Sequence, residues 1–255
     1  MIIDADCHIS SQEFDSLAIT ADELIEQMDQ AGIGKAIIWL KPPYDRDIAP
    51  ENKAVYEATR KHPDRLLGFG WANPRLGNAA TVDAIKQCFE EYGFLGIKFN
   101  GAQDDYVIDD PDIGLPFIEK ATQYGKPIAF HIGADFYENT HPYRLGHIAS
   151  SFPDARFFMV HMGGATLPAL DRSAIEVAAR NPNITIIGSA IPAQAILSAI
   201  HTVGVERVCF GSDTPFCLMH VELAKYRALL RDFDKADQDR VLGGNIARVL
   251  GLPGA

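Results

Sequence analysis

The sequence contains no apolar run of the roughly 18 to 20 residues that a membrane-spanning helix needs. Its N-terminus begins directly as a strand at Met1-Ile2-Ile3-Asp4, without the basic segment and apolar core of a signal peptide. It also has too little positive charge to form a basic surface, because the net charge is −11. We therefore expect neither nucleic acid nor an anionic membrane as a partner, although one lysine or metal ion is enough to bind a small anionic substrate.

Cysteine is scarce and forms no Cys-x-x-Cys pair; the four residues are Cys7, Cys88, Cys209 and Cys217. This spacing is typical of free thiols in a reducing compartment, so we expect a cytoplasmic protein. The sequence also lacks G-x-G-x-x-G after its first apolar run, which removes the main signal of a nucleotide-binding open sheet. Internal repeats, low-complexity segments and linkers are missing too, so we expect residues 1–255 to form a single domain.

Short apolar runs rich in Ile, Val, Phe and Leu recur along the chain, at residues 1–6, 36–40, 66–71, 95–99, 128–132, 157–161, 184–188 and 207–211. Most are nearly continuous rather than alternating, which is typical of parallel strands buried on both faces. Longer segments with helical spacing lie between most of them. Strands alternating with helices imply parallel pairing with right-handed crossovers, and the length suits one barrel. The sequence thus predicts a single (β/α)8 TIM barrel, with an open doubly wound sheet as the alternative.

Several helices have clear boundaries in the sequence. Thr20 and Glu23 form a capping box, and Gly32 offers a left-handed stop for the helix that follows Thr20. Asn245 is a candidate N-cap for a last helix through Leu250. Further helices are expected at 51–61, 78–92, 113–124 and 166–180. Irregular stretches are expected after the second, fourth and fifth strands, where they would rim the C-terminal mouth of a barrel, at residues 41–50, 100–112 and 133–146.

Chemically active side chains recur at the ends of these predicted strands. Asp6 and His8 are two residues apart, so on an extended segment both point to the same side. His131 and His161 end the fifth and sixth runs, and Asp213 follows the eighth. Each has an ordinary explanation, as a hydrogen-bonded core histidine or a turn aspartate. Because carboxylates and imidazoles are metal ligands, their recurrence at equivalent strand ends predicts one metal site at the barrel mouth.

The chain resembles the amidohydrolase superfamily, and more closely its amidohydrolase-related branch, which includes aminocarboxymuconate-semialdehyde and resorcylate decarboxylases and many uncharacterised hydrolases. The resemblance runs over essentially the whole chain, and the order and spacing of its segments make it specific. These segments are Ile3-Asp4-Ala5-Asp6-Cys7-His8, His62-Pro63-Asp64-Arg65-Leu66-Leu67-Gly68, Gly96-Ile97-Lys98-Phe99, the two histidine strands, Gly211-Ser212-Asp213 and Gly243-Gly244-Asn245-Ile246-Ala247-Arg248.

The resemblance implies roles for the strand-end residues. Asp6 stands where the family usually has the first histidine of its H-x-H ligand motif, and His8 matches the second. His131 is implied as a further metal ligand, and His161 as the residue that polarises substrate or moves a proton. Asp213 is implied as both ligand and general base. One divalent ion is expected, with Zn²⁺ as the first choice and Mn²⁺ as the alternative, because two carboxylates make a harder and more neutral site.

Four more residues are candidate substrate contacts. Lys98 ends the fourth strand, and we interpret it as a structural or substrate-anion contact rather than a carbamylated bridge between two metals. Trp39 and Trp71 end the second and third strands, where they are expected either to line the pocket or to pack beneath the loops. His141 lies in the long segment after the fifth strand, as a substrate contact or a solvated loop residue.

The leading hypothesis is a metal-dependent hydrolase of a small carbonyl compound, such as a lactone, ester or amide. A metal-bound water would attack the carbonyl while Asp213 and His161 move protons. The alternative is a metal-dependent, non-oxidative decarboxylase of a small aromatic or unsaturated carboxylic acid, which would use the same ligands. A third hypothesis, of another class, is a non-catalytic ligand-binding barrel. The resemblance also implies a homodimer or a larger homo-oligomer.

Overall fold

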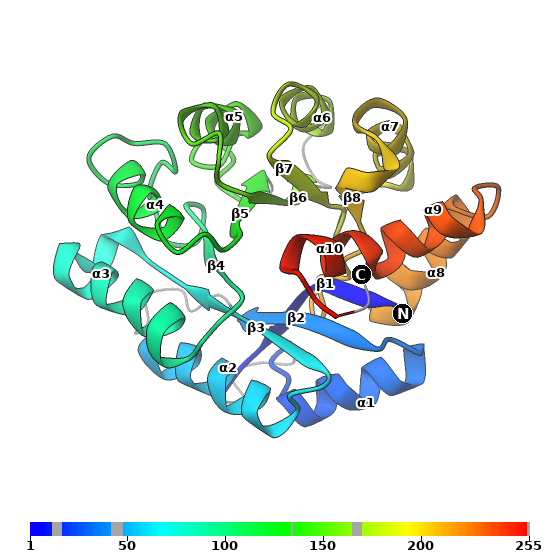
Figure 1. Cartoon of the computed structure of the whole chain (residues 1–255), viewed down its shortest axis with the longest axis horizontal. Helices are drawn as coiled ribbons and strands as arrows, with labels where there is room; N and C mark the ends of the chain where they lie inside the picture. Colours follow the sequence, from blue (N-terminus) through cyan, green and yellow to red (C-terminus); the bar gives the residue numbers. More distant parts are fainter. Residues whose placement is uncertain (12–16, 42–47, 134, 165–169, 254–255) are drawn as a thin grey trace.

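The computed structural model describes residues 1–11, 17–41, 48–133, 135–164 and 170–253. Eight parallel strands pair in chain order and form one sheet, which confirms the predicted TIM barrel. Figure 1 shows these strands at the centre of a ring of helices. The strands are β1 (Ile3–Ile9), β2 (Lys35–Leu40), β3 (Leu66–Trp71), β4 (Gly96–Phe99), β5 (Ile128–Gly133), β6 (Phe157–Gly163), β7 (Ile184–Ile187) and β8 (Val208–Cys209).

Backbone hydrogen bonds between β1 and the segment that follows β8 close the barrel. The Asp213 N–H donates to the Asp6 carbonyl oxygen at 2.8 Å, and the His8 N–H donates to the Thr214 carbonyl oxygen at 2.7 Å. The two ends of the predicted site, which are more than 200 residues apart in the sequence, are therefore joined directly by main chain.

Helices cover the outside of the barrel. They are α1 (Ala21–Ala31), α2 (Ala49–Lys61), α3 (Asn78–Lys86), α4 (Leu115–Thr122), α5 (Pro142–Ser151), α6 (Leu170–Arg180), α7 (Ala193–Val203), α8 (Met219–Leu229), α9 (Lys235–Asp239) and α10 (Asn245–Leu250). Short 3-10 or π turns occur at η1 (Pro74–Leu76), η2 (Gln87–Glu91), η3 (Val205–Arg207) and η4 (Arg240–Gly244). Within the described ranges, no helix is both long enough and apolar enough to cross a membrane.

The predicted start and stop of α1 are confirmed. The Thr20 side chain accepts from the Glu23 N–H while the Glu23 carboxylate accepts from the Thr20 N–H, and Gly32 has φ 73°. The prediction for Asn245 is wrong, because Gly244 is the N-cap of α10. The Asn245 amide instead donates to the carbonyl oxygens of Val205 and Val208, so it ties α10 to the turn before β8.

Other helix boundaries differ from the sequence in detail. α5 begins at Pro142, inside a stretch that was expected to be irregular, because proline suits the first turn of a helix. α6 begins at Leu170 within the described chain, whereas the prediction started at 166; residues 165–169 lie outside the described residues. Residues 42–47 of the predicted irregular stretch 41–50 also lie outside them.

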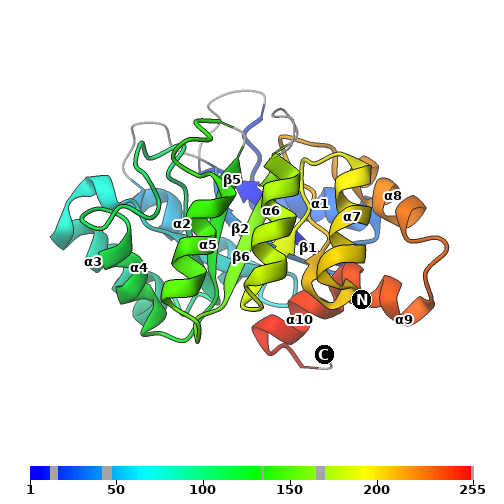
Figure 2. The ribbon, with the colours of Figure 1, turned by 90° about the horizontal axis from the view of Figure 1, so that it is seen from above.

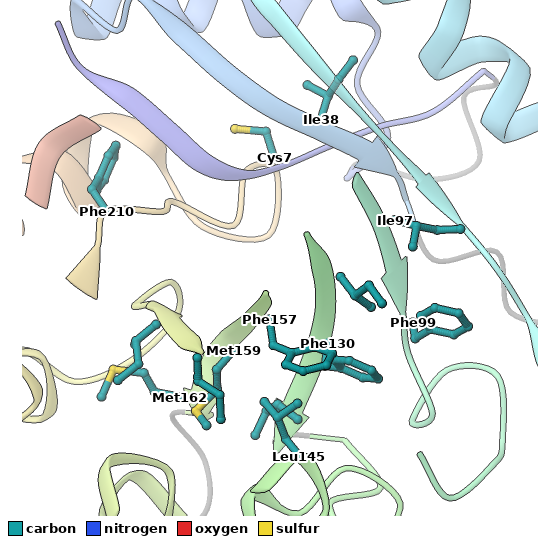
Figure 3. Packing of buried hydrophobic residues seen from close by; sticks show 14 of the residues in the cluster. Cys7, Ile38, Ile97, Phe99, Phe130, Leu145, Phe157, Met159, Met162 and Phe210 are labelled. Atoms are coloured by element: carbon teal, nitrogen blue, oxygen red, sulfur yellow. The ribbon is translucent and has the colours of Figure 1, made fainter. Parts of the chain in front are cut away.

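The core has two layers that follow the strand alternation. In β6, Phe158 and Val160 pack inside the barrel. Phe157 and Met159 pack between the sheet and the helices (Figure 3). This two-sided burial explains the nearly continuous apolar runs.

The helix α10 belongs to the inner layer. Ile246, Ala247 and Val249 pack with the side chains inside the barrel. Figure 2 shows α10 and the C-terminus together at one end of the barrel. Arg156, which precedes β6, donates to the Val249 carbonyl oxygen at 2.7 Å, so this is the end where strands begin. The predicted site residues lie at the opposite end of the barrel, where the strands finish.

Candidate active site

All but one of the predicted site residues contact one another at the ends of the strands. The carboxylates, imidazoles and lysine among them are nearly inaccessible to solvent, and Asp213 has the largest exposed fraction, at 9%. The members of this cluster are Asp6 and His8 on β1, Trp39 on β2, Trp71 on β3, Lys98 on β4, His131 on β5, His161 on β6 and Asp213 after β8.

Left-handed backbone occurs near three successive strand ends. His161 has φ 69°, Ala190 has φ 49° and Asp213 has φ 62°, a region that residues other than glycine rarely occupy. Val160 points into the barrel, so regular alternation would send His161 outward. The reversed φ of His161 breaks this alternation and lets its ring face Asp6. Such departures from regular backbone cluster at functional sites.

Asp6 lies at the centre of the cluster. Its Oδ1 is 3.5 Å from His8 Nε2 and 3.8 Å from Lys98 Nζ. Its Oδ2 is 3.6 Å from His161 Nδ1 and accepts a hydrogen bond from Ser189 Oγ. Burial raises the pKa of Asp6, but the neighbouring Lys98, His161 and His8 together outweigh burial and hold it well below the usual range. Asp6 is therefore a carboxylate.

His8 is hydrogen-bonded through both ring nitrogens. Its Nδ1 lies 2.7 Å from the Leu40 carbonyl oxygen, which can only accept, so Nδ1 carries the proton. Its Nε2 accepts from the Trp39 indole N–H at 3.0 Å and lies 3.6 Å from Asp213 Oδ1. Burial lowers the pKa of His8, and Lys98 lowers it further. The neutral ring thus directs its Nε2 lone pair to the Trp39 indole, and both carboxyl groups lie close to the same nitrogen.

Asp213 is the most exposed of the site's acidic groups. Burial raises its pKa well above the usual range, and the nearby Asp6 raises it further, against the opposing effect of Lys98. The protonated form of this carboxyl group is therefore more favoured than that of an exposed aspartate. It can both donate a proton and, once deprotonated, act as a ligand.

His131 and His161 lie edge to face, with ring centroids 4.7 Å apart and an interplanar angle of 68°. Burial, then His161 and Lys98, keep the pKa of His131 well below its usual range. Burial is also the main cause that lowers the pKa of His161, to about 4. Both rings are therefore neutral and each offers one nitrogen lone pair.

Lys98 is fully buried between aromatic rings. Its Nζ lies 3.8 Å from the centroid of the Trp39 ring and 5.5 Å from that of Trp71. Burial lowers its pKa, whereas Asp6 and Asp213 act in the opposite direction. Both tryptophans are fully buried, and their role as substrate contacts stays a prediction. They hold the ammonium group by cation–π contact.

His141 is the predicted residue that the structure does not bring to the cluster. It is the N-cap of α5, where its Nδ1 accepts from the Tyr143 N–H and its ring stacks on the Tyr143 ring. Capping of α5 is enough to explain the position of His141, without a contact to substrate.

The donor atoms fit a divalent cation. Asp6 Oδ1 and His131 Nε2 are buried and have no hydrogen-bond partner among the residues that the structure describes. Ligand atoms of Asp6, His161 and Asp213 all lie within 4.8 Å of one another. Oxygen and imidazole nitrogen donors suit Zn²⁺ and Mn²⁺. The cluster is thus a possible metal site that includes His161, which sequence reasoning assigned to proton transfer, while the full ligand assignment stays a prediction.

Two residues outside the predicted site, Asp4 and Ser189, support the cluster from below. The Asp4 Oδ1 accepts from the backbone N–H groups of Asp6 (3.1 Å) and Ser212 (2.8 Å), and burial raises the Asp4 pKa to about 7. Ser189 Oγ contacts both Asp6 and His161. Ser189 follows directly after the predicted strand 184–188, so the strand-end rule could have found it if hydroxyl groups had been considered along with Asp and His.

Comparison with known families gives the site its context. The profile of the Amidohydrolase family matches residues 3–252, which is nearly the whole chain. The chain belongs to the amidohydrolase superfamily. Its relatives place it in the branch of aminocarboxymuconate-semialdehyde decarboxylase, as the sequence motifs indicated. It is therefore an enzyme of this superfamily.

Two relatives are decarboxylases. The 2-amino-3-carboxymuconate-6-semialdehyde decarboxylase of Dictyostelium discoideum is 20% identical, with 94% of this chain and 79% of the relative covered. The gamma-resorcylate decarboxylase of Rhodococcus jostii (strain RHA1) is 23% identical, with 76% of this chain and 77% of the relative covered.

Solved structures show the same barrel. A 2,6-dihydroxybenzoate decarboxylase in complex with 2,6-dihydroxybenzoate has a TM-score of 0.81 and 20% identity, and 99% of each chain is covered. A dihydroxybenzoic acid decarboxylase from Polaromonas sp. JS666, with bound manganese and the inhibitor 2-nitroresorcinol, has a TM-score of 0.75 and 18% identity. That match covers 100% of this chain and 98% of the other.

The hydrolase hypothesis, which the sequence reasoning put first, is wrong. The curated relatives and most of the similar structures are resorcylate, dihydroxybenzoate, carboxyvanillate or aminocarboxymuconate-semialdehyde decarboxylases, so the findings favour the alternative. The physical reason for the error is that both reactions use the same carboxylate and imidazole ligands. The types of residue at the strand ends could not separate them.

Proposed function

We propose that this protein is a metal-dependent, non-oxidative decarboxylase of a small aromatic or unsaturated carboxylic acid. The observation that carries the proposal is the position of Asp213, the most exposed acidic group of the cluster, where burial and the nearby Asp6 raise its pKa. Decarboxylation needs an acid that can reach the carbon that loses its carboxylate. Asp6 is inaccessible to solvent and ionised, so Asp213 is the group suited to act as this acid.

Asp213 would protonate the substrate carbon that bears the carboxylate. A C–H bond forms there as the Asp213 O–H bond breaks. The bond from that carbon to the carboxylate then breaks, its electron pair returns to the unsaturated system, and CO2 leaves. Asp213 regains a proton from water at the mouth. His161, held neutral, would accept a hydrogen bond from a substrate hydroxyl group next to the reacting carbon.

We assign the cation site to Asp6, His8 and His131, which Asp213 joins as a ligand when it is deprotonated, and give Mn²⁺ first place over Zn²⁺. Two carboxyl groups favour the harder ion, and manganese is bound in the Polaromonas dihydroxybenzoic acid decarboxylase structure. A bound divalent ion would supply the positive charge that holds the substrate carboxylate and an adjacent oxygen. The fully buried Lys98 adds a second positive charge beneath the same site, which favours an anionic substrate.

Phe216 supports a flat, apolar substrate. Its backbone N–H donates to the Asp213 carbonyl oxygen at 2.8 Å, which fixes the turn after Asp213. Its ring lies edge to face with His8, with ring centroids 5.3 Å apart, and 39% of the residue is exposed. An aromatic face is thus offered to solvent next to the acid.

We further propose that residues 1–255 act as one domain, since α10 shares the inner core of the barrel. We also propose that the protein forms a homo-oligomer.

Measuring CO2 release tests the proposed function. The protein, loaded separately with Mn²⁺ and Zn²⁺, is offered 2,6-dihydroxybenzoate, 5-carboxyvanillate and 2-amino-3-carboxymuconate-6-semialdehyde. We expect one of them to release CO2, with one deuterium at the reacting carbon when the solvent is D2O. The absence of CO2 release from all three, together with tight binding of any of them, would favour the non-catalytic barrel.

A further inference from the structure

The hydroxyl group of Ser189 bridges two functional side chains at the bottom of the site. Ser189 follows β7, is fully buried and precedes Ala190 with its left-handed φ. Its Oγ hydrogen-bonds Asp6 Oδ2 on one side and lies 3.0 Å from His161 Nδ1 on the other. Three different strand ends therefore meet at one oxygen atom.

Counting protons fixes the direction of both hydrogen bonds. A serine hydroxyl has one proton to donate, and an ionised carboxylate can only accept. The Ser189 proton therefore goes to Asp6 Oδ2. Ser189 Oγ then has lone pairs and no proton left for the imidazole, so His161 Nδ1 must carry a proton and donate it to Oγ.

We propose that Ser189 is a positioning residue that determines which oxygen of Asp6 faces the cation and which nitrogen of His161 carries the proton. This inference rests on the proposed function, because it concerns the same site. With Oδ2 held by Ser189, Asp6 presents Oδ1, the atom that lies within 4 Å of His8 Nε2 and Lys98 Nζ. With Nδ1 protonated, the neutral His161 ring presents the Nε2 lone pair.

The hydroxyl group, rather than the bulk of the residue, carries this role. A serine and an alanine fill nearly the same volume, so Ser189→Ala removes one oxygen atom and both hydrogen bonds without changing the packing around Cβ. Ser212 offers a matched control. It is fully buried at the next strand end, but its side chain contacts Thr214, Cys7 and Asp4 rather than Asp6 or His161.

Two measurements without substrate test the inference. Calorimetric titration with Mn²⁺ should show affinity for Ser189→Ala about 10 to 100-fold weaker than for the wild type, as for other losses of outer hydrogen bonds to metal ligands. Long-range ¹⁵N–¹H spectra of the imidazoles, recorded before metal is added, should show His161 as a single Nδ1–H tautomer in the wild type. In Ser189→Ala the Nε2–H form should appear. The spectrum of His161→Gln identifies the signal.

Ser212→Ala should leave both the Mn²⁺ affinity and the His161 tautomer unchanged. An unchanged tautomer in Ser189→Ala would overturn the inference, whatever the metal affinity, and so would equal losses of affinity in the two serine variants. Because neither measurement uses a substrate, a failed search for CO2 release would count against the proposed reaction and leave the role of Ser189 intact.

Discussion

Lys98 Nζ lies 3.8 Å from Asp6 Oδ1, and both side chains are completely shielded from solvent. A lysine and a carboxylate buried together are costly to separate, because either one left alone would be an uncompensated charge. The proposed divalent cation would bind the same Asp6 oxygen. Lysine and metal would then both contribute positive charge to one carboxylate.

Replacing Lys98 should make the fold dependent on metal. We expect Lys98→Met to reduce the free energy of unfolding by about 3 to 5 kcal/mol without metal, since Asp6 loses its cation. Added Mn²⁺ should restore much of this loss, because a ligand that binds the folded state stabilises it by mass action. Urea unfolding with and without Mn²⁺ measures both effects.

Lys61→Met is the control for that experiment. Lys61 pairs with Asp22 on the surface, where both side chains are more than half exposed, so its loss should change stability by less than about 1 kcal/mol. Similar losses in the two variants, or no effect of Mn²⁺ on Lys98→Met, would contradict the idea that lysine and metal serve the same carboxylate.

Asp213→Asn should preserve the fold and nearly abolish CO2 release. The amide keeps the size of the side chain but cannot transfer the proton, so turnover should fall by about 10²- to 10⁴-fold. Circular dichroism and the thermal midpoint check that the fold is intact. Turnover within a few-fold of the wild type would remove Asp213 from the proposed role of acid.

His131→Ala should lower the metal content, because it removes a buried imidazole nitrogen that has no other partner in the described part of the chain. Inductively coupled plasma mass spectrometry after equilibration with Mn²⁺ gives the stoichiometry. His141→Ala is the matched control, since it removes a helix cap at a loss of about 0.5 to 2 kcal/mol and should keep full metal content. Full stoichiometry in His131→Ala would contradict the ligand assignment.

Asp104 should make stability depend on pH. Burial raises the Asp104 pKa to about 7, against the hydrogen bond from the Trp71 indole, which lowers it. An acid whose pKa is higher in the folded state contributes stability that is full below its unfolded pKa, near 4. That contribution falls as pH rises and stops falling above pH 7.

The matching measurement compares urea unfolding of the wild type and Asp104→Asn at pH 5 and pH 8. The wild type should lose more stability between these two values than the variant, by about 2 kcal/mol, because the amide does not titrate. Other titrating groups, including the buried Asp4, are present in both proteins and cancel in the difference. Equal pH dependence in the two proteins would show that Asp104 ionises normally.

The sequence predicts the barrel well because strands buried on both faces leave continuous apolar runs. It is less accurate where polar chemistry interrupts a strand. β1 extends to Ile9, beyond the predicted residue 6, since Asp6 and His8 do not look like strand interior. β8 contains Val208 and Cys209 alone, because the chain beyond them pairs with β1 through isolated hydrogen bonds.

Part of the site could be predicted from the sequence for a similar reason. Aspartate and histidine at strand ends are unusual enough to be noticed, whereas a serine such as Ser189 is common at that position. Backbone conformation was out of reach, since the left-handed φ of His161 depends on the neighbouring strands. The capping role of His141 could not be predicted, because a histidine that caps a helix and one that binds substrate look identical until the helix start is known.

The hydrogen bonds that join β1 to the segment after β8 have a consequence for biosynthesis. A nascent chain shorter than about 214 residues has made Asp6 and His8 but not the residues that dock against them. Cation affinity should therefore arise late, once the ribosome has released the final strand. Any truncated product would carry an acidic, half-built pocket with its first strand unpaired on one edge.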